Sequence, residues 1–174
     1  MVKYSSSSTA QKTFRLLPGV VISIGLCAAV SLPALADDQV YHGNFCTPVR
    51  ADTNKIEHGH QYGVHNVSSS TATVQCPFIH PFTHSSVSVN NVWVTVYDRN
   101  PNTNVSCTLY GVALHGERIW QVSASSTGSS STHRFLQLTP PQNQGVHTMN
   151  MTCTIPGISN NNLSHIATYW ISRP

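Results

Sequence analysis

Histidine is the residue type with the most evident capacity for chemistry in this sequence. The chain of 174 residues has ten histidines but only six acidic side chains. His58 and His60 flank a glycine, so in an extended segment both imidazoles lie on one face, and His65 follows. Because imidazole clusters bind zinc and copper, one hypothesis is a metal site at these three positions. The alternative is that histidine replaces charged residues on a polar surface.

Aromatic side chains indicate a second kind of binding chemistry. Trp93 and Tyr97 lie on the same face of an alternating segment, and Trp120 lies on another predicted strand. Alternate residues of a strand are about 6–7 Å apart, so exposed aromatic rings can stack on the rings of an oligosaccharide. The alternative is that Trp93 is buried, as large aromatic side chains usually are. These three residues are the predicted ligand-binding set.

The residues needed for catalysis are poorly represented. There is no Gly-x-Ser-x-Gly motif, and a hydrolase would have to draw its carboxylates from Asp52, Glu57, Asp98 and Glu117. Asp98 begins an Asp-Arg-Asn-Pro sequence typical of a turn, and Glu117 follows a glycine in another predicted turn. The sequence therefore predicts no catalytic residue and no cofactor, with a small secreted hydrolase as an alternative.

The first 36 residues have the three parts of a secretory signal peptide. Lys12 and Arg15 precede an apolar stretch over 16–35, which closes on the cleavage signal Ala-Leu-Ala. An uncleaved anchor is the alternative, since about 20 apolar residues can span a bilayer, but the Ala-Leu-Ala ending favours cleavage. We therefore expect residues 1–36 to be removed and residues 37–174 to form one secreted or periplasmic domain without a membrane span.

Removal of the leader also changes the charge of the protein. Lys3, Lys12 and Arg15 lie in the leader, so six basic and six acidic side chains remain and the formal charge becomes zero. A nucleic-acid-binding protein needs a cationic face for phosphate, and a polybasic membrane-surface protein needs a similar patch. The remaining composition argues against both classes.

The cysteines that remain after cleavage predict two disulfides. Cys27 lies in the leader, which leaves Cys46, Cys76, Cys107 and Cys153. An even number of cysteines in an exported chain is typical of a disulfide framework. Four cysteines allow three pairings, and we favour Cys46–Cys76 with Cys107–Cys153 because local partners are the simplest. The other two pairings remain open.

The elements that position these residues are predicted to be strands. Ser, Thr and Asn make up about a third of residues 37–174, which disfavours surface helices and suits strands joined by polar turns. Apolar residues alternate with polar ones over 72–78, 92–97, 105–109 and 151–155. Further strands are expected near 41–46, 62–67, 117–124, 133–138 and 165–171. This pattern predicts an all-β fold, an antiparallel β-sandwich or jelly roll with two disulfides.

Several strand and turn sequences carry a resemblance to a known group of proteins. They are QYGVHN over 61–66, ATVQCP over 72–77, VTVYDRN over 94–100 and VSCTL over 105–109. With these segments the chain resembles a group of uncharacterised secreted bacterial β-sandwich proteins. The resemblance implies export, a β fold and a bacterial source, and it implies no activity.

Together these observations predict an exported non-catalytic module with a binding or structural role. Its expected partner is an extracellular glycan or a cell-surface polymer, and the alternative is a histidine-mediated zinc or copper protein. The ten imidazoles add a prediction about charge, because unperturbed imidazole titrates near pH 6.5. Acidification from about pH 7 to 5 should make the protein strongly cationic.

Overall fold

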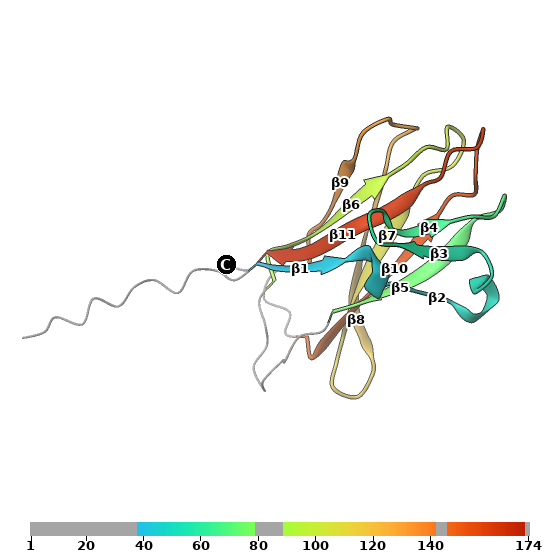
Figure 1. Ribbon diagram of the computed structural model, residues 1–174. Coiled ribbons are helices and arrows are strands. Elements are labelled where there is room, and N and C mark those ends of the chain that lie inside the picture. The colour runs from blue at the N-terminus through green and yellow to red at the C-terminus, as the bar shows by residue number, and fades with distance from the viewer. Residues whose placement is uncertain (1–37, 79–88, 142–145, 173–174) are drawn as a thin grey trace, which may run out of the picture. The chain divides into compact units, whose positions relative to one another are not determined.

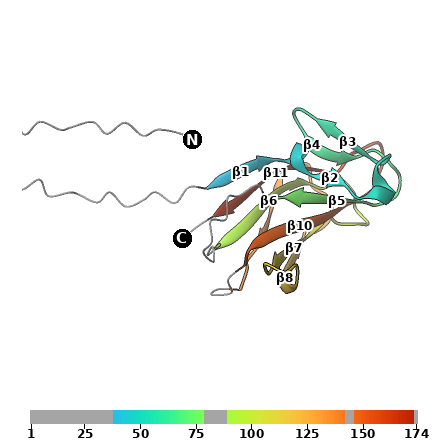
Figure 2. The ribbon, with the colours of Figure 1, turned by 90° about the horizontal axis from the view of Figure 1, so that it is seen from below.

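The computed structural model describes residues 38–78, 89–141 and 146–172, and these residues form a β-sandwich. All strand pairs are antiparallel, and the strands form two sheets that lie in two layers (Figures 1 and 2). The predicted fold class is therefore confirmed. The predicted signal peptide, residues 1–36, lies outside the described residues, as do two of the ten histidines, His80 and His84. No helix within the described ranges is long and apolar enough to cross a membrane.

The first sheet has six strands. Their order is β3 (Ile56–Gly59), β4 (Gly63–Asn66), β11 (His165–Ser172), β6 (Asn91–Tyr97) and β9 (Arg134–Leu138), and β1 (Gln39–His42) also pairs with β11. β4 pairs with the start of β11 at His165 and Ile166, whereas β1 pairs with its later residues. The two short strands therefore share one edge of β11, and β6 covers the other edge.

The second sheet has five strands. Their order is β2 (Thr47–Pro48), β5 (Ala72–Pro77), β10 (Thr148–Ile155), β7 (Ser106–Val112) and β8 (Arg118–Ser125). Two 3-10 turns, η1 (Gly43–Phe45) and η2 (Arg50–Asp52), connect the short strands at the beginning of the chain. β10 lies at the centre of this sheet, where β5 and β7 pair with its two edges.

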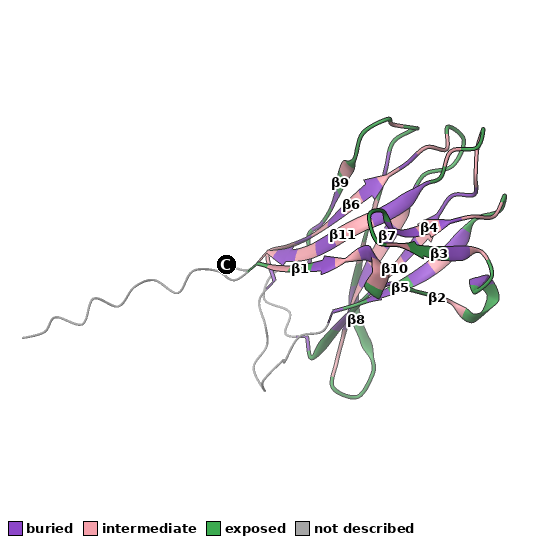
Figure 3. Cartoon of the chain, viewed as in Figure 1, coloured by how far each residue is buried: buried purple, intermediate pink, exposed green. Residues whose placement is uncertain are grey.

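The core lies between the sheets and follows the predicted alternation. In β6 the valines at 92, 94 and 96 are fully buried, so the residues between them lie on the outer face of the sheet. Figure 3 shows the resulting alternation of buried and intermediate segments along this strand. Tyr169 of β11 links the two layers, because its buried hydroxyl donates a 2.7 Å hydrogen bond to the carbonyl of Pro77. Its ring stacks on Tyr41 with centroids 5.1 Å apart. Burial raises the pKa of Tyr169, so this hydroxyl remains a donor.

Both predicted disulfides are present with the favoured pairing. Cys107 and Cys153 are register partners on β7 and β10, and their disulfide joins neighbouring strands of the second sheet. The Cys46–Cys76 disulfide joins the residue before β2 to β5. All four cysteines are buried in the core, as the apolar phase of Cys76, Cys107 and Cys153 in the alternating segments predicted.

The beginning of the domain differs from the prediction. The strand expected over 41–46 ends at His42, because the chain turns at Gly43 into a 3-10 turn. A β-carbon at position 43 would lie 2.0 Å from the carbonyl oxygen of Ile166, so only glycine lets the chain pass this close to β11. The short strands β2 and β3 were not predicted, whereas the expected strands later in the chain are present with boundaries shifted by up to three residues.

Candidate functional site: an aromatic ridge beside a polar pocket

An aromatic ridge, formed by Trp93, Trp170 and Phe135, lies on the outer face of the six-stranded sheet. Trp93 and Trp170 are register partners on β6 and β11, and their rings are parallel within 14° with centroids 6.0 Å apart. Phe135 of β9 meets Trp170 edge to face at 5.8 Å and is 62% exposed. Val40 of β1, opposite Trp170 on its other side, is 67% exposed. The ridge therefore continues into an exposed apolar strip across four strands.

A row of threonines separates the tryptophans of this ridge from a more polar region of the same face, and Phe135 is the register partner of Thr95 in this row. Thr95 of β6 and Thr168 of β11 are register partners, and their hydroxyl oxygens are 3.0 Å apart in a hydrogen bond. Both side chains are short, so this row is lower than the rings beside it. The face therefore has a shallow step between its apolar and polar parts.

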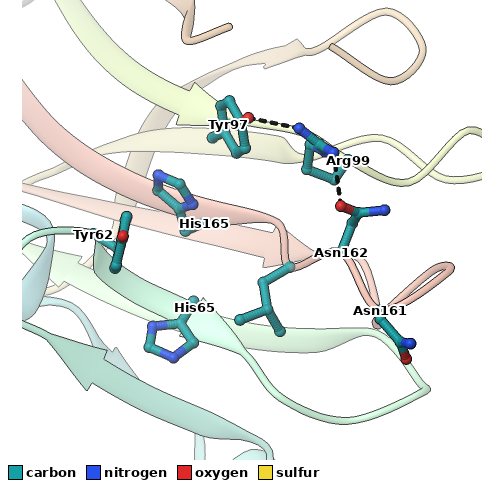
Figure 4. Close-up of a pocket in the computed structure, with 8 residues that line it drawn as sticks. Tyr62, His65, Tyr97, Arg99, Asn161, Asn162 and His165 are labelled. Atoms are coloured by element: carbon teal, nitrogen blue, oxygen red, sulfur yellow. Dashed lines mark hydrogen bonds between the residues drawn. The ribbon is translucent and has the colours of Figure 1, made fainter. Parts of the chain in front are cut away.

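The polar part is a pocket of about 280 Å³ at the end of β6 and the start of β11 (Figure 4). Its lining residues are Tyr62, His65, Tyr97, Arg99, Asn161, Asn162, Leu163 and His165. These residues come from β4, β6, β11, the turn between β3 and β4, the loop that follows β6, and the turn before β11. The pocket therefore depends on segments that are far apart in the sequence.

The turn over residues 159–162 shapes one wall of the pocket. Asn160 and Asn161 have positive φ angles of 49° and 60°, a conformation that asparagine tolerates better than most residues. Ser159 and Asn162 close the turn with backbone hydrogen bonds in both directions, at 3.2 and 2.9 Å. This tight turn directs the Asn162 side chain toward the loop that follows β6 (Figure 4).

Arg99 is the cationic residue of the pocket. Its Nη1 donates to the Tyr97 hydroxyl and its Nη2 donates to Asn162 Oδ1, each at 2.7 Å (Figure 4). The guanidinium carbon lies 5.3 Å from the centre of the Tyr97 ring, which adds a cation–π contact. Among the described residues no carboxylate forms an ion pair with Arg99. The positive charge is therefore held by neutral groups.

Hydrogen bonds to Asp98 fix the position of the Arg99 backbone. The carboxylate is fully buried, and its Oδ1 accepts from Ser164 Oγ while its Oδ2 accepts from Val105 N and Ser126 Oγ. Ser164 Oγ in turn accepts a 2.9 Å hydrogen bond from the backbone N–H of Arg99. A buried carboxylate with this many donors holds its surroundings rigidly. Asp98 was expected to be only the first residue of a turn, and in the structure it is the acceptor of a larger hydrogen-bond network.

His165 forms the floor of the pocket as a neutral ring. Its side chain is buried beside Tyr97, with ring centroids 5.0 Å apart, and its Nε2 is 3.4 Å from His133 Nε2. Burial, together with the nearby His133 and His65, lowers the pKa of His165 to about 4. His165 is therefore uncharged at neutral pH.

The three histidines proposed as metal ligands do not converge. Glu57 and His65 are register partners, as are His58 and Val64, so His58 and His65 occupy opposite faces of the β3–β4 ribbon. His60 lies in the turn between the strands, and His65 Nε2 faces Glu57 Oε2 at 3.6 Å. Within the described part of the chain, no group of three His, Cys, Asp or Glu side chains is arranged to hold a metal ion.

The predicted ligand-binding residues are divided between the two sheets. Trp93 and Tyr97 share the outer face of the first sheet, as the alternation indicated. Trp120 belongs to β8 of the second sheet, where it is only 8% exposed and covers Gly111 on β7. The structure therefore does not bring Trp120 to the ridge, and Trp170 occupies the place beside Trp93. Trp170 alternates with the buried residues Tyr169 and Ile171 in the predicted strand 165–171. This alternation was the sequence signal that could have placed Trp170 on the outer face.

The four carboxylates that a hydrolase would draw on do not line the described pocket. Asp52 forms a 2.7 Å ion pair with Lys55 and accepts a hydrogen bond from the backbone of Thr73. The hydrogen bond from Lys55 makes the largest contribution to lowering the pKa of Asp52, and the hydrogen bond from Thr73 makes the next largest. Asp98 is buried in its hydrogen-bond network, and neither aspartate lines the pocket. Glu57 and Glu117 are also absent from the described pocket lining.

Comparison with known proteins gives similarity of fold only. No family model and no curated protein matches the sequence. A low-affinity xylan-binding module of family 86 from Roseburia intestinalis has a TM-score of 0.47 and 11% identity, covering 79% of this chain and 96% of that chain. A xylan-binding module of family 15 has a TM-score of 0.46 and 9% identity, and the match covers 79% of this chain and 97% of that chain. A family 6 carbohydrate-binding module has a TM-score of 0.44 and 12% identity, and the match covers 78% of this chain and 94% of that chain.

Proposed function

We propose that this protein is an exported, non-catalytic glycan-binding module that uses the outer face of its six-stranded sheet. The observation that carries the proposal is the aromatic ridge, with half-buried tryptophans and an exposed Phe135, on the same face as a polar pocket. A sugar ring has apolar C–H faces and hydroxyl groups around its edge. Flat aromatic rings accommodate the C–H faces, and Arg99, Asn162 and the threonine row offer hydrogen-bonding groups for the hydroxyls.

The length of the site indicates an oligosaccharide as the ligand. Trp93 and Tyr97 are four residues apart on β6, which places them about 13 Å apart along the strand. A single sugar ring is too short to touch both positions, whereas a short chain of sugars can follow the strand direction from the ridge into the pocket. We therefore expect oligosaccharides to bind more tightly than monosaccharides.

The rigidity of the site favours binding of a flexible polymer. The ridge side chains pack against one another on paired strands, and the pocket side chains are tied by hydrogen bonds. A binding surface that is already ordered loses little conformational freedom when the ligand arrives. The ordering cost is then mainly that of the glycan.

The test is retention of the protein on a panel of insoluble polysaccharides. The Trp93→Ala and Trp170→Ala variants should lose retention, whereas the matched control Leu114→Ala should keep it. Leu114 is 70% exposed and lies in the turn between β7 and β8, away from the ridge. Unchanged retention of both tryptophan variants would contradict the proposed face, and hydrolysis of any polysaccharide in the panel would contradict the non-catalytic role.

A further inference from the structure

We infer that the pocket binds the carboxylate of an acidic sugar, so that the preferred ligands are polysaccharides that contain uronic acids. This inference rests on the proposed glycan-binding function and names the class of glycan. It follows from three features of the pocket: its charge, the free donors of Arg99, and the connection of Arg99 to the aromatic ridge.

The described lining of the pocket contains a cation and no anion. Arg99 is its permanently charged residue, and the other polar groups are tyrosine, histidine and asparagine side chains. Glu57 forms an ion pair with His65 of the lining, and its side chain is 68% exposed to solvent. The buried Asp98 carboxylate accepts from Ser164, Val105 and Ser126 and forms no ion pair with the guanidinium. The charge of Arg99 is therefore available to a ligand.

Arg99 also retains hydrogen-bonding capacity. A guanidinium has five N–H donors, and the side chain uses two of them, toward Tyr97 and Asn162. The remaining three have no acceptor among the described residues. A carboxylate is a planar acceptor that matches the guanidinium fork, and such charge-assisted bonds are roughly twice as strong as neutral ones. A sugar hydroxyl would satisfy one donor but would leave the charge unpaired.

The position of Arg99 makes this contact compatible with stacking on the ridge. Tyr97 lies on the same outward row of β6 as Trp93, and its hydroxyl accepts from Arg99. The backbone N–H of Arg99 is fixed through Ser164 to the buried Asp98. A glycan that runs along β6 therefore brings a sugar substituent beside a guanidinium that is already oriented.

The domain as a whole has no excess of positive charge to attract acidic polymers. Residues 37–174 carry six basic and six acidic side chains. A preference for acidic glycans must therefore depend on the local site and should be sensitive to the loss of one arginine. Arg118 supplies a matched control, because it also lies beside a tyrosine, 5.9 Å from the ring centre of Tyr110, but on the five-stranded sheet.

The experiment measures binding to alginate, polygalacturonate and glucuronoxylan at neutral pH, each beside its carboxyl-reduced form. Reduction converts the uronic acid into a neutral sugar of the same backbone. We expect at least one of the three polymers to bind about tenfold more tightly than its reduced form, the range of a hydrogen bond to a charged group. Arg99→Gln should abolish the preference, and Arg118→Gln should leave it unchanged.

A second variant keeps the test decisive if Arg99→Gln perturbs folding. Asn162→Asp places a carboxylate where Arg99 already donates, so it should neutralise the guanidinium with almost no change of shape and also abolish the preference. Equal binding of carboxylated and reduced polymers would overturn this inference while leaving glycan binding intact. Failure to bind any polymer, reduced or not, would overturn both.

Discussion

At the scale of single residues, burial in the fold changes the protonation of His165. Its pKa is lowered from 6.5 to about 4 by burial and by His133 and His65. Below pH 6.5 the unfolded chain binds a proton that the folded protein does not accept until about pH 4. The free energy of unfolding should therefore fall by about 3 kcal/mol across this window and show no effect of His165 above it.

The measurement is urea unfolding of the wild type and His165→Gln at several pH values between 7 and 4. The difference between the two proteins isolates His165 from other titrating groups. We expect the wild type to lose more stability than the variant as the pH falls. Parallel pH profiles for the two proteins would show that His165 has the same pKa in the folded and unfolded states, which would contradict the lowered pKa.

Asp98 gives a second prediction at the residue scale. Asp98→Ala removes the acceptor for Val105 N, Ser126 Oγ and Ser164 Oγ, and unpaired buried donors are costly. We expect a loss of about 3 kcal/mol in the free energy of unfolding. Glu117→Ala, at an exposed turn, serves as the control with a change near zero. Equal stability of the two variants would contradict the role of Asp98.

Some of the site residues were predictable from the sequence and others were not. Trp93 and Tyr97 were found because the valines between them define the buried face of β6. Trp120 was included as a tryptophan on another predicted strand, and the sequence cannot tell which sheet that strand joins or that Gly111 lies opposite. Arg99 was missed because its partner Asn162 is 63 residues away in the chain. His165 also contributes no charge to the gain predicted between pH 7 and 5, since it stays neutral above about pH 4.

At the scale of elements, the pairing of β7 and β8 depends on a glycine. Gly111 lies under the Trp120 indole, and a β-carbon at this position would lie 2.2 Å from Trp120 Cε2. Because the indole is rigid and buried, Gly111→Ala should destabilise the protein by about 1–3 kcal/mol through overpacking. Gly59→Ala is the control, since a β-carbon there would make an ordinary 3.5 Å contact. Thermal unfolding that ranks Gly59→Ala as the more destabilising change would contradict this packing.

The predictability of the elements followed their length and regularity. Strands β5, β6, β7 and β10 have several alternating residues each, and their buried faces were identified from the sequence. β2 has two residues, and β3 has one buried residue among four, so neither contains a readable period. The early end of β1 depends on the close approach of Gly43 to β11, a contact between segments over a hundred residues apart.

At the scale of the whole molecule, both disulfides form covalent links to strands of the five-stranded sheet. They span 30 and 46 residues of sequence and both reach strands of the five-stranded sheet. We expect each to contribute about 3–4 kcal/mol to the free energy of unfolding, chiefly by restricting the unfolded chain. Peptide mapping of the oxidised protein should yield only Cys46–Cys76 and Cys107–Cys153. A Cys46–Cys107 or Cys46–Cys153 peptide, or alkylation without reduction, would contradict the fold.

The sandwich leaves each sheet with one outer face, and the two faces differ in chemistry. The six-stranded sheet carries the aromatic ridge and the pocket of Arg99. The five-stranded sheet presents mainly Ser, Thr, Asn and Gln, with its tryptophan turned into the core. Our proposal therefore places glycan binding on one face of the molecule, and the three tryptophans provide probes on both sheets.

The most direct test uses the indole N–H resonances of the three tryptophans during titration with a bound oligosaccharide, assigned with single Trp→Phe variants. Trp93 and Trp170 lie on the proposed binding face, whereas Trp120 is buried on the opposite sheet. Our account predicts that the resonances of Trp93 and Trp170 shift together with saturation and that the resonance of Trp120 does not move. A shift of Trp120 alone, or saturation with both ridge resonances unchanged, would contradict it.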